Sequence, residues 1–238
     1  MRALDWDGYL NCRDLGGLPT PSGPTLPGRV ARGPRRELLT ATGWAHAHAW
    51  GLRTVVDLRC PDETGCRSGD PAVDSAAPHG TKVILSPTED HANAEFRKTC
   101  FPILDSPEYW PHNLRILPGL IRRTLKAIAA AEPGILIHCS AGRDRTGMIT
   151  AVLLANAGVA PEVIAEDYAE SVVAMAGAQA NSATADRQAT WGSVEVDAWL
   201  VTACPLVVDF AAGIDRYLSQ AGVQRVERDR LRSLLLAD

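Results

Sequence analysis

The chain has 238 residues, 46% of them hydrophobic and 22% charged, which is ordinary for a globular protein with one sizeable domain. Its formal net charge of −4 argues against a nucleic-acid partner, because proteins that bind nucleic acids are more often basic. It has no apolar run of about eighteen residues, so we expect no integral membrane segment. The first residues also lack the apolar core of a signal peptide. The default location is therefore the cytoplasm, with export by a route that needs no such signal left open.

The six cysteines are not spaced as metal ligands. None forms a Cys-x-x-Cys pair, and no group of histidines and cysteines has the spacing of a zinc site. His46 and His48 lie on a predicted helix, where they point in different directions with no third ligand nearby in the sequence. We therefore expect no metal and no cofactor, and we expect free thiols in a reducing compartment.

The first half of the chain predicts short strands and one helix. Glycine and proline are frequent in residues 1–35, which favours turns between short strands. Residues 37–50 predict a helix or two short turns. The β-branched run in residues 51–59 predicts a strand that is covered on both faces, and residues 81–85 predict another strand. Residues 86–105 are mixed and polar, with no regular element expected.

The second half alternates between helices and strands. Apolar residues at helical spacing predict one long helix over residues 107–131. The apolar run at residues 134–137 predicts a buried strand, and residues 148–155 predict a buried helix. The order of strand, helix, strand and helix predicts an α/β fold with a largely parallel sheet, and residues 1–238 show no domain boundary.

Three further helices are predicted, over residues 161–175, 206–218 and 226–236. Residues 174–190 are rich in Ala, Gln, Asn, Ser and Thr, a composition with helix propensity but few apolar anchors. We interpret residues 170–200 as a loosely held helical insertion. It is either a lid or an exposed helical hairpin with no gating role.

The stretch from His138 to Gly147 lies between a predicted strand and a predicted helix, and within it Cys139 and Arg145 enclose five residues. So short a loop can turn its backbone N–H groups inward as a nest for phosphate oxygens, and the helix adds the positive end of its dipole. Arg145 can bind two oxygens at once through its planar guanidinium group. The sequence therefore predicts a site for an anion.

The same positive field favours the thiolate form of Cys139, which can attack a bound phosphate in line. The attack would give a phosphocysteine intermediate, which water then hydrolyses. Thr146 can hydrogen-bond Cys139 when the thiolate departs, and Gly142 suits a loop position with unusual backbone angles. His138 supports the loop, and the residues predicted to bind the phosphate are Ser140, Ala141, Gly142, Arg143 and Thr146.

A proton must reach the leaving oxygen, and three carboxylates are candidates for the acid. Asp144 lies inside the loop, whereas Asp57 and Asp62 lie at and beyond the end of the predicted strand at residues 51–59. The carboxyl ends of parallel strands meet at one rim, so Asp57 and Arg59 are predicted to support the site near Cys139. A local Asp–Arg pair that only stabilises a loop explains the same two residues equally well.

The motif His138-Cys139-x5-Arg145-Thr146-Gly147 resembles the signature loop of the cysteine-dependent protein tyrosine phosphatase superfamily. Two further segments resemble elements of its bacterial atypical tyrosine and lipid phosphatase group. They are Asn11-Cys12-Arg13-Asp14-Leu15-Gly16-Gly17, and Thr54-Val55-Val56-Asp57-Leu58-Arg59 with Glu63. The resemblance runs in order from about residue 10 to about residue 170.

The resemblance implies a sheet of four or five strands flanked by helices, often under a helical lid. It implies hydrolysis of phosphotyrosine in proteins, and in some members also of phosphoserine, phosphothreonine or phosphoinositides. It makes Cys139 the nucleophile and Arg145 the phosphate-binding residue. By resemblance to members with aspartate in the loop, Asp144 becomes the favoured acid.

Two features depart from the pattern. Arg143 stands where lipid-active members usually carry lysine, which keeps the charge but changes the geometry. The sequence also has no Trp-Pro-Asp loop of the kind that supplies the acid in many tyrosine phosphatases. The nearest match, Tyr109-Trp110-Pro111-His112, lacks the aspartate, and we interpret it as the start of a helix.

Two other functional classes fit parts of the pattern. A non-catalytic phosphate-binding module would lack the nucleophile or the arginine, and both are present here. Sulfurtransferases and arsenate reductases also use cysteine loops on α/β folds. They lack the Asp14-Leu15-Gly16-Gly17 element, and they would transfer sulfur or consume thiols instead of releasing phosphate.

Overall fold

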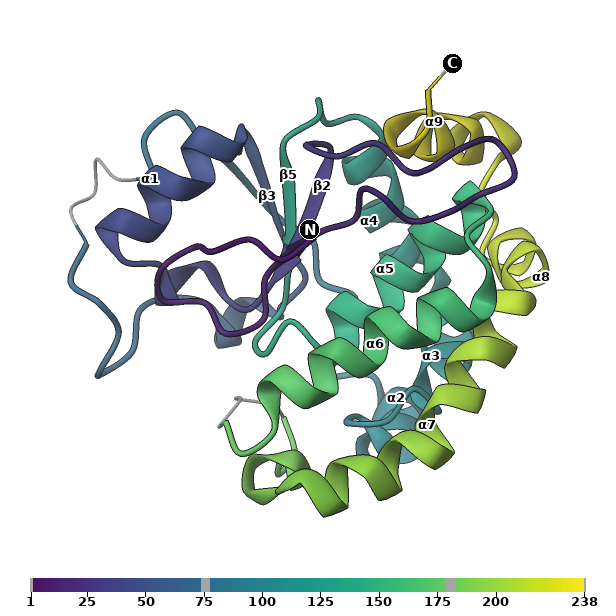
Figure 1. The fold of residues 1–238 in the computed structure, drawn as a ribbon. Helices are drawn as coiled ribbons and strands as arrows, with labels where there is room; N and C mark the ends of the chain where they lie inside the picture. Colours follow the sequence, from purple (N-terminus) through teal and green to yellow (C-terminus); the bar gives the residue numbers. More distant parts are fainter. Residues whose placement is uncertain (1, 74–77, 179–182, 238) are drawn as a thin grey trace.

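The computed structural model describes residues 2–73, 78–178 and 183–237, and among these residues it contains one five-stranded sheet (Figure 1). The strands are β1 (Arg13–Asp14), β2 (Val30–Gly33), β3 (Thr54–Asp57), β4 (Lys82–Leu85) and β5 (Ile135–His138). Their order across the sheet is β1-β2-β5-β3-β4, and only β1 runs antiparallel to its neighbour. The predicted α/β fold with a mostly parallel sheet of four or five strands is confirmed.

Helices surround this sheet in the described part of the chain. The α-helices are α1 (Ala41–Trp50), α2 (Ala94–Cys100), α3 (Tyr109–Ile116), α4 (Pro118–Ala129), α5 (Asp144–Ala157), α6 (Pro161–Met175), α7 (Ser193–Ala212), α8 (Ile214–Gln220) and α9 (Arg225–Leu235). Short 3-10 turns are η1 (Arg36–Leu38), η2 (Pro61–Glu63), η3 (Phe101–Ile103) and η4 (Arg187–Thr190).

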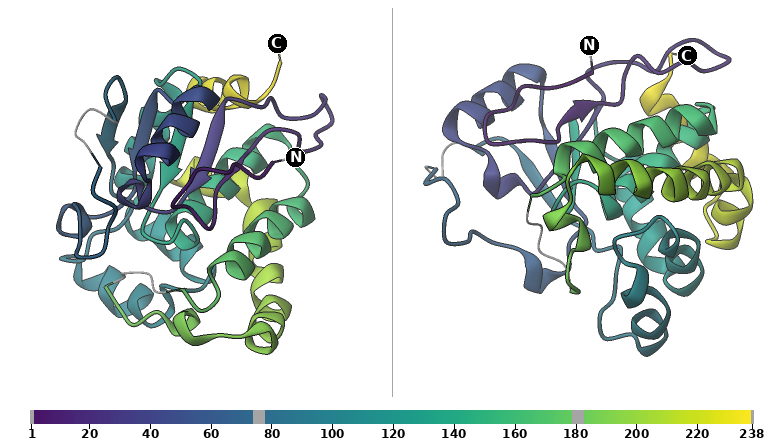
Figure 2. Two further views of the ribbon diagram at one scale, coloured as in Figure 1. Left: turned by 60° about the vertical axis from the view of Figure 1, so that its left-hand side comes forward. Right: turned by 60° about the horizontal axis from the view of Figure 1, so that its bottom comes forward.

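The two faces of the sheet have separate hydrophobic cores. Val55 and Leu136 pack with Trp44 of α1 in the smaller core, whereas Val56 and Ile137 belong to the larger core on the opposite face. Successive side chains of a strand point to opposite faces, so a strand covered on both sides is mostly apolar. Figures 1 and 2 show α1 on one side of the sheet and helices α4, α5 and α6 on the other.

The predicted long helix over residues 107–131 is wrong, because the chain forms two helices there, α3 and α4. Pro118 has no backbone N–H and restricts the residue before it, so Leu117 leaves the helical region with φ −122° and ψ 45°. Residues 86–105 contain a helix that the sequence reasoning missed, α2. Its first turn is capped by the Asn93 side chain, which accepts a hydrogen bond from the Phe96 N–H.

The predicted helix over residues 206–218 is likewise two helices, α7 and α8, which meet at Gly213. Among the described residues, no single helix has the length and apolar character needed to cross a membrane. In the part of the chain that the structure describes, the pair α7 and α8 passes that test by combined length and composition, but the two helices are bent by 64° relative to each other. The inward side chains Ala203, Val207 and Phe210 of α7 belong to the larger core.

The connection between α6 and α7 falls inside the predicted insertion at residues 170–200. Residues 179–182 lie outside the described residues. In the described part of the connection, regular structure is limited to η4, so the helical character expected for residues 174–190 is found only there and in the end of α6. Trp191 contacts Trp199 of α7 with ring centroids 5.3 Å apart, which anchors the end of the connection.

Candidate active site

The cysteine loop begins where the central strand β5 ends. In the register of the sheet, His138 pairs with Asp57 of β3 on one side and with Gly33 of β2 on the other. The loop therefore emerges at the carboxyl edge of the parallel strands, where α/β proteins bind their ligands. Helix α5 begins at Asp144, earlier than predicted, so Asp144 and Arg145 lie in its first turn.

Four consecutive carbonyl oxygens of residues 139–142 accept hydrogen bonds from groups outside the loop. The donors are His138 Nδ1 to Cys139 O at 2.9 Å, the Arg35 N–H to Ser140 O at 3.0 Å, and Asn11 Nδ2 to both Ala141 O and Gly142 O at 3.2 Å. In a planar trans peptide the N–H group points away from the carbonyl. Holding the carbonyls outward therefore turns the following N–H groups toward the inside of the loop, as an anion nest requires.

Gly142 closes the loop in a conformation that other residues rarely adopt. Its φ is +72°, and a Cβ atom at this position would lie 2.4 Å from the carbonyl oxygen of Gly33. Backbone angle and space both demand glycine. The prediction of unusual backbone angles at Gly142 is confirmed.

The Asn11 side chain is held by a buried ionic network. Arg13 donates to Asn11 Oδ1 at 2.7 Å and to Asp167 Oδ1 at 2.8 Å. Arg32 donates to Gly142 O at 2.8 Å and also pairs with Asp167. Burial acts to raise the pKa of Asp167, but these arginines hold it well below its usual range. The Asp167 carboxylate of α6 thus holds in place the two side chains, Asn11 and Arg32, that hydrogen-bond to the loop carbonyls.

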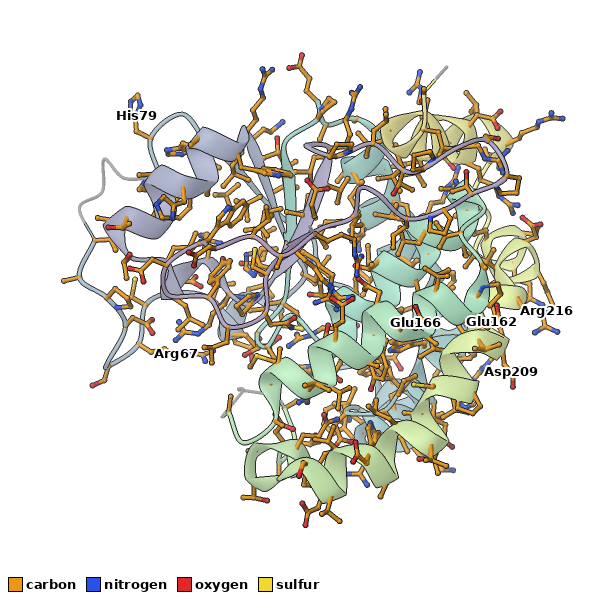
Figure 3. The ribbon with its side chains drawn as sticks, viewed as in Figure 1. Arg67, His79, Glu162, Glu166, Asp209 and Arg216 are labelled. Carbon is orange, nitrogen blue, oxygen red and sulfur yellow. The ribbon has the colours of Figure 1, made fainter. Side chains whose placement is uncertain are left out.

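Sequence reasoning missed Asp167, although α6 itself was predicted. Glu162 and Glu166 are exposed on the outer face of this helix (Figure 3). Asp167 is only 1% exposed and follows the buried Ile164 by three residues, so it lies on the inward face. An acidic residue within the apolar stripe was the available signal.

Arg145 is held by carboxylates from two other segments. Glu63 accepts hydrogen bonds from both terminal nitrogens of Arg145, one of them at 2.8 Å, and Glu89 lies 3.5 Å from Nη1. Burial opposes the charge, but Glu89 and Glu63 raise the pKa of Arg145 well above its usual value. The guanidinium group is therefore charged and fixed in its plane. Glu63 belongs to a segment that the resemblance includes, yet the sequence assigned it no role.

Asp57 and Arg59 are completely buried, and Asp57 lies beside His138 in the sheet register, one residue before Cys139. Asp57 accepts hydrogen bonds from Arg59 at 2.7 Å and from Arg36 at 2.9 Å. Burial alone would raise the pKa of Asp57, but the bond to Arg59 lowers it to about 2. His138 lies 3.7 Å from Asp57, and burial lowers its pKa to about 4, so the ring is neutral near pH 7.

Arg143 and Asp144 form the rim of the loop. Arg143 Nε donates to Asp144 at 3.1 Å, and Nη2 donates to Asp186 at 3.0 Å. Burial raises the pKa of Asp144 despite the opposing charge of Arg143. Arg143 Nη1 and the Thr146 hydroxyl are buried without a hydrogen-bond partner among the described groups. The bond between Thr146 and Cys139 that the sequence suggested is therefore not formed.

A cavity of about 20 Å³ is lined by Cys139, Asp144 and Arg145. Ala185 and Asp186 line it from the connection between α6 and α7. A volume of this size holds about one water molecule. Of the three candidate acids, only Asp144 lines this cavity. Asp57 is sealed in its ion pairs, and Asp62 is exposed beside a separate cavity of about 760 Å³.

The connection over the cavity is tied to the loop between α2 and α3. Arg187 pairs with Asp105, with Nε donating at 2.7 Å, and Gln188 Nε2 donates to the Asp105 carbonyl at 2.9 Å. Asp186 completes this set of contacts through Arg143. We call residues 185–188 the cover.

The fold and the loop together define a class of protein, namely an α/β protein that presents a cysteine loop at the carboxyl edge of a parallel sheet. A family model described as the tyrosine phosphatase family matches residues 4–237. The chain therefore belongs to the tyrosine phosphatase family and is a phosphatase enzyme.

Named relatives agree with this assignment. The chain is similar to the triple specificity protein phosphatase PtpB of Mycobacterium tuberculosis, with 26% identity over 99% of this chain and all of that protein. It is 30% identical to a Cupriavidus necator protein provisionally named a tyrosine-protein phosphatase, over 92% of this chain and 83% of that one. It is 36% identical to a tyrosine-protein phosphatase of Nostoc commune over 52% of this chain and 41% of that protein.

Proposed function

We propose that the enzyme hydrolyses phosphomonoesters through a phosphocysteine intermediate on Cys139, with phosphotyrosine in proteins as its main substrate. The observation that carries the proposal is the arrangement of the loop around Cys139. The loop carbonyls are held outward by hydrogen bonds from His138, Arg35 and Asn11. The Arg145 guanidinium group is oriented by two hydrogen bonds to Glu63. Donors fixed before the substrate arrives need no reorganisation during the reaction.

In the first step the Cys139 thiolate attacks phosphorus, so that a sulfur–phosphorus bond forms while the bond to the leaving oxygen breaks. The three remaining phosphate oxygens bind the loop N–H groups and Arg145. Asp144 donates a proton to the leaving oxygen. Burial raises its pKa, which keeps the proton available at higher pH than for an exposed aspartate.

In the second step water attacks the phosphocysteine, and Asp144 now accepts the proton from that water. The sulfur–phosphorus bond breaks, and inorganic phosphate and the thiolate are released. The positive end of helix α5 and the loop donors stabilise the thiolate as it leaves.

The charge around the rim favours a single phosphate group over a polyphosphorylated lipid headgroup. Arg143, the cation that a second phosphate would need, is already paired with Asp144 and Asp186. Glu89 and Asp105 add further negative charge to the cavity wall. We therefore propose that phosphotyrosine peptides are better substrates than phosphoinositides, with phosphoserine and phosphothreonine peptides in between.

The cavity of about 20 Å³ is too small for a phosphotyrosine side chain, so the cover must move before a substrate binds. We propose that the cover acts as a lid. Of the two charge pairs that hold the cover, Arg187–Asp105 has an exposed arginine and is weak, whereas Arg143–Asp186 is buried and must separate when the cover opens.

The central test is Cys139→Ser, with Cys66→Ser as control because Cys66 is also a free cysteine but is exposed. We expect Cys139→Ser to abolish turnover of p-nitrophenyl phosphate while inorganic phosphate still binds, and Cys66→Ser to remain active. Rapid acid quenching of the wild type should trap phosphate on Cys139. Turnover by the Cys139→Ser protein would refute the mechanism.

The acid is tested with Asp144→Asn, compared with Asp57→Asn and Asp62→Asn. We expect Asp144→Asn to slow phenyl phosphate more than p-nitrophenyl phosphate, because the poorer leaving group needs the proton more. The same preference in Asp62→Asn alone would assign the acid to Asp62 instead. Sulfur transfer from thiosulfate, or thiol-coupled arsenate reduction, without phosphate release would favour the other cysteine-loop enzymes.

A further inference from the structure

Three side chains of the kinds that bind transition metals meet beside the phosphate loop. Cys60 follows β3, Glu63 ends η2, and His91 comes from the segment after β4. Each offers one ligand atom, and these three atoms lie within 4.8 Å of one another. Cys60 and His91 are 31 residues apart in the sequence, so no short spacing motif in the sequence indicates the cluster.

The distance between Cys60 and His91 is close to that expected for two ligands of one zinc ion. Zinc bonds of about 2.3 Å to sulfur and about 2.0 Å to nitrogen place those two ligands about 3.6 Å apart. Cys60 Sγ lies 3.9 Å from His91 Nε2, so a shift of a few tenths of an ångström suffices. Glu89 Oε2, 3.0 Å from the same nitrogen, is a further oxygen beside the cluster. Thiolate, imidazole and carboxylate together select zinc or cobalt over calcium or magnesium.

The cluster is accessible from solvent. Cys60, Glu89 and His91 line the cavity of about 760 Å³, which provides an access route and room for a water ligand. Asp62 and Asp90 lie on the same cavity wall and add negative charge that attracts a cation. The His91 side chain is 20% exposed, so its ring can adjust without disturbing the core.

We propose that Cys60, Glu63 and His91 form a binding site for Zn²⁺, and that its occupation inhibits the enzyme through Arg145. Glu63 is shared, because its two oxygens hold the Arg145 guanidinium and one of them also accepts from the Cys60 N–H at 2.8 Å. A zinc ion that takes Glu63 as a ligand removes the carboxylate that fixes Arg145. The inhibitory effect rests on the proposed function, whereas binding of the metal does not.

Binding is tested first in the Cys139→Ser protein, so that the cysteine of the loop cannot hold the metal. We expect one Zn²⁺ per chain by calorimetry, and a near-ultraviolet thiolate-to-cobalt absorption band when Co²⁺ is added. Adding Cys60→Ser to the Cys139→Ser protein should remove this thiolate-to-cobalt band. Cys60→Ser or His91→Gln should weaken zinc binding at least about 10-fold. Loss of a group that only hydrogen-bonds to a metal ligand already weakens metal binding by that factor. Unchanged affinity in both variants would overturn the site.

The link to Arg145 is tested by turnover in the protein with Cys139 intact. We expect zinc to inhibit the wild type and Cys66→Ser alike, and to inhibit His91→Gln at least about 10-fold more weakly. Equal inhibition of His91→Gln would place the inhibitory zinc on Cys139 and refute the link. If the proposed phosphatase mechanism itself failed, the cobalt band of the Cys139→Ser protein would still report the metal site.

Discussion

The floor and the cover of the cavity at the candidate site are held in contrasting ways. The floor, the loop at residues 139–143, is gripped by Asn11 and Arg32, which depend in turn on the buried carboxylate of Asp167. The cover depends on Asp186 and on Arg187, whose side chain is 53% exposed. The floor is held by a buried network, whereas the cover combines the buried pair Arg143–Asp186 with the pair Arg187–Asp105, whose arginine is exposed.

This difference in burial indicates that the floor is the more rigidly held part and that the Arg187–Asp105 contact is the most easily broken part of the cover. Removing one partner of a buried ionic network leaves uncompensated charge in a medium that cannot solvate it, whereas exposed pairs contribute at most about 1 kcal/mol. A fixed floor keeps the donors of the loop in place around the phosphate. In the proposed lid, the exposed Arg187–Asp105 contact is the part of the cover that opens at least cost.

The largest expected effect is that of Asp167→Asn, which leaves Arg2, Arg13 and Arg32 without their shared counter-charge. We expect the free energy of unfolding in urea to fall by about 3–5 kcal/mol. The control is Glu166→Gln, at the exposed neighbouring position (Figure 3), which should change it by less than about 0.5 kcal/mol. Equal effects of the two changes would contradict the role of Asp167 as the anchor of the floor.

We also expect the free energy of unfolding to depend on pH through His138, which donates to the floor at the Cys139 carbonyl. The pKa of His138 is lowered to about 4 in the folded protein, against about 6.5 when unfolded, so its contribution to stability is complete above pH 6.5. As the pH falls from 6.5 toward 4, the unfolded state binds a proton that the folded state refuses, and up to about 3 kcal/mol is lost. We expect His138→Asn to reduce this slope in urea unfolding, whereas His79→Asn, at an exposed site (Figure 3), should retain it. Identical slopes in both variants would exclude His138 as the source.

Asn11→Ala tests the grip on the loop itself. Loss of the amide leaves the carbonyls of Ala141 and Gly142 with fewer buried donors, which should lower stability by about 1–3 kcal/mol. Small displacements of the loop should lower kcat/KM for p-nitrophenyl phosphate by about 10- to 100-fold. Leu10→Ala, at a neighbouring side chain that is 72% exposed, is the control and should leave both quantities near the wild-type values. An Asn11→Ala enzyme with normal kcat/KM would show that the loop holds its shape unaided.

The smallest change in stability is expected for the cover. Arg187→Gln removes the pair with Asp105 and should lower the free energy of unfolding by at most about 1 kcal/mol. A looser cover should lower KM for a phosphotyrosine peptide a few-fold with little change in kcat. Arg115→Gln, which breaks the exposed pair with Glu95, should alter neither. A KM that does not respond to Arg187→Gln would argue against a lid.

Local sequence was sufficient for the elements that carry the loop. The apolar runs before and after it predicted a buried strand and a buried helix, and both formed, with α5 starting only a few residues earlier than expected. Gly142 was recognised as a position for unusual backbone angles. Where the prediction failed, at Pro118 and Gly213, apolar periodicity continued through residues that break a helix.

The partners of the loop were decided only by the tertiary structure. Arg145 and Glu63 are 82 residues apart, and Arg13 and Asp167 are 154 apart, so no spacing in the sequence indicates that they pair. The choice among the carboxylates likewise depends on surroundings, because Asp57 is ionised beside Arg59 while burial favours a proton on Asp144. The sequence by itself determined where the cysteine, the arginine and the backbone that joins them lie, since an apolar run, a glycine turn and helical periodicity are local features of the chain. Charge and burial at a site depend on every segment that packs against it, and only the folded chain brings those segments together.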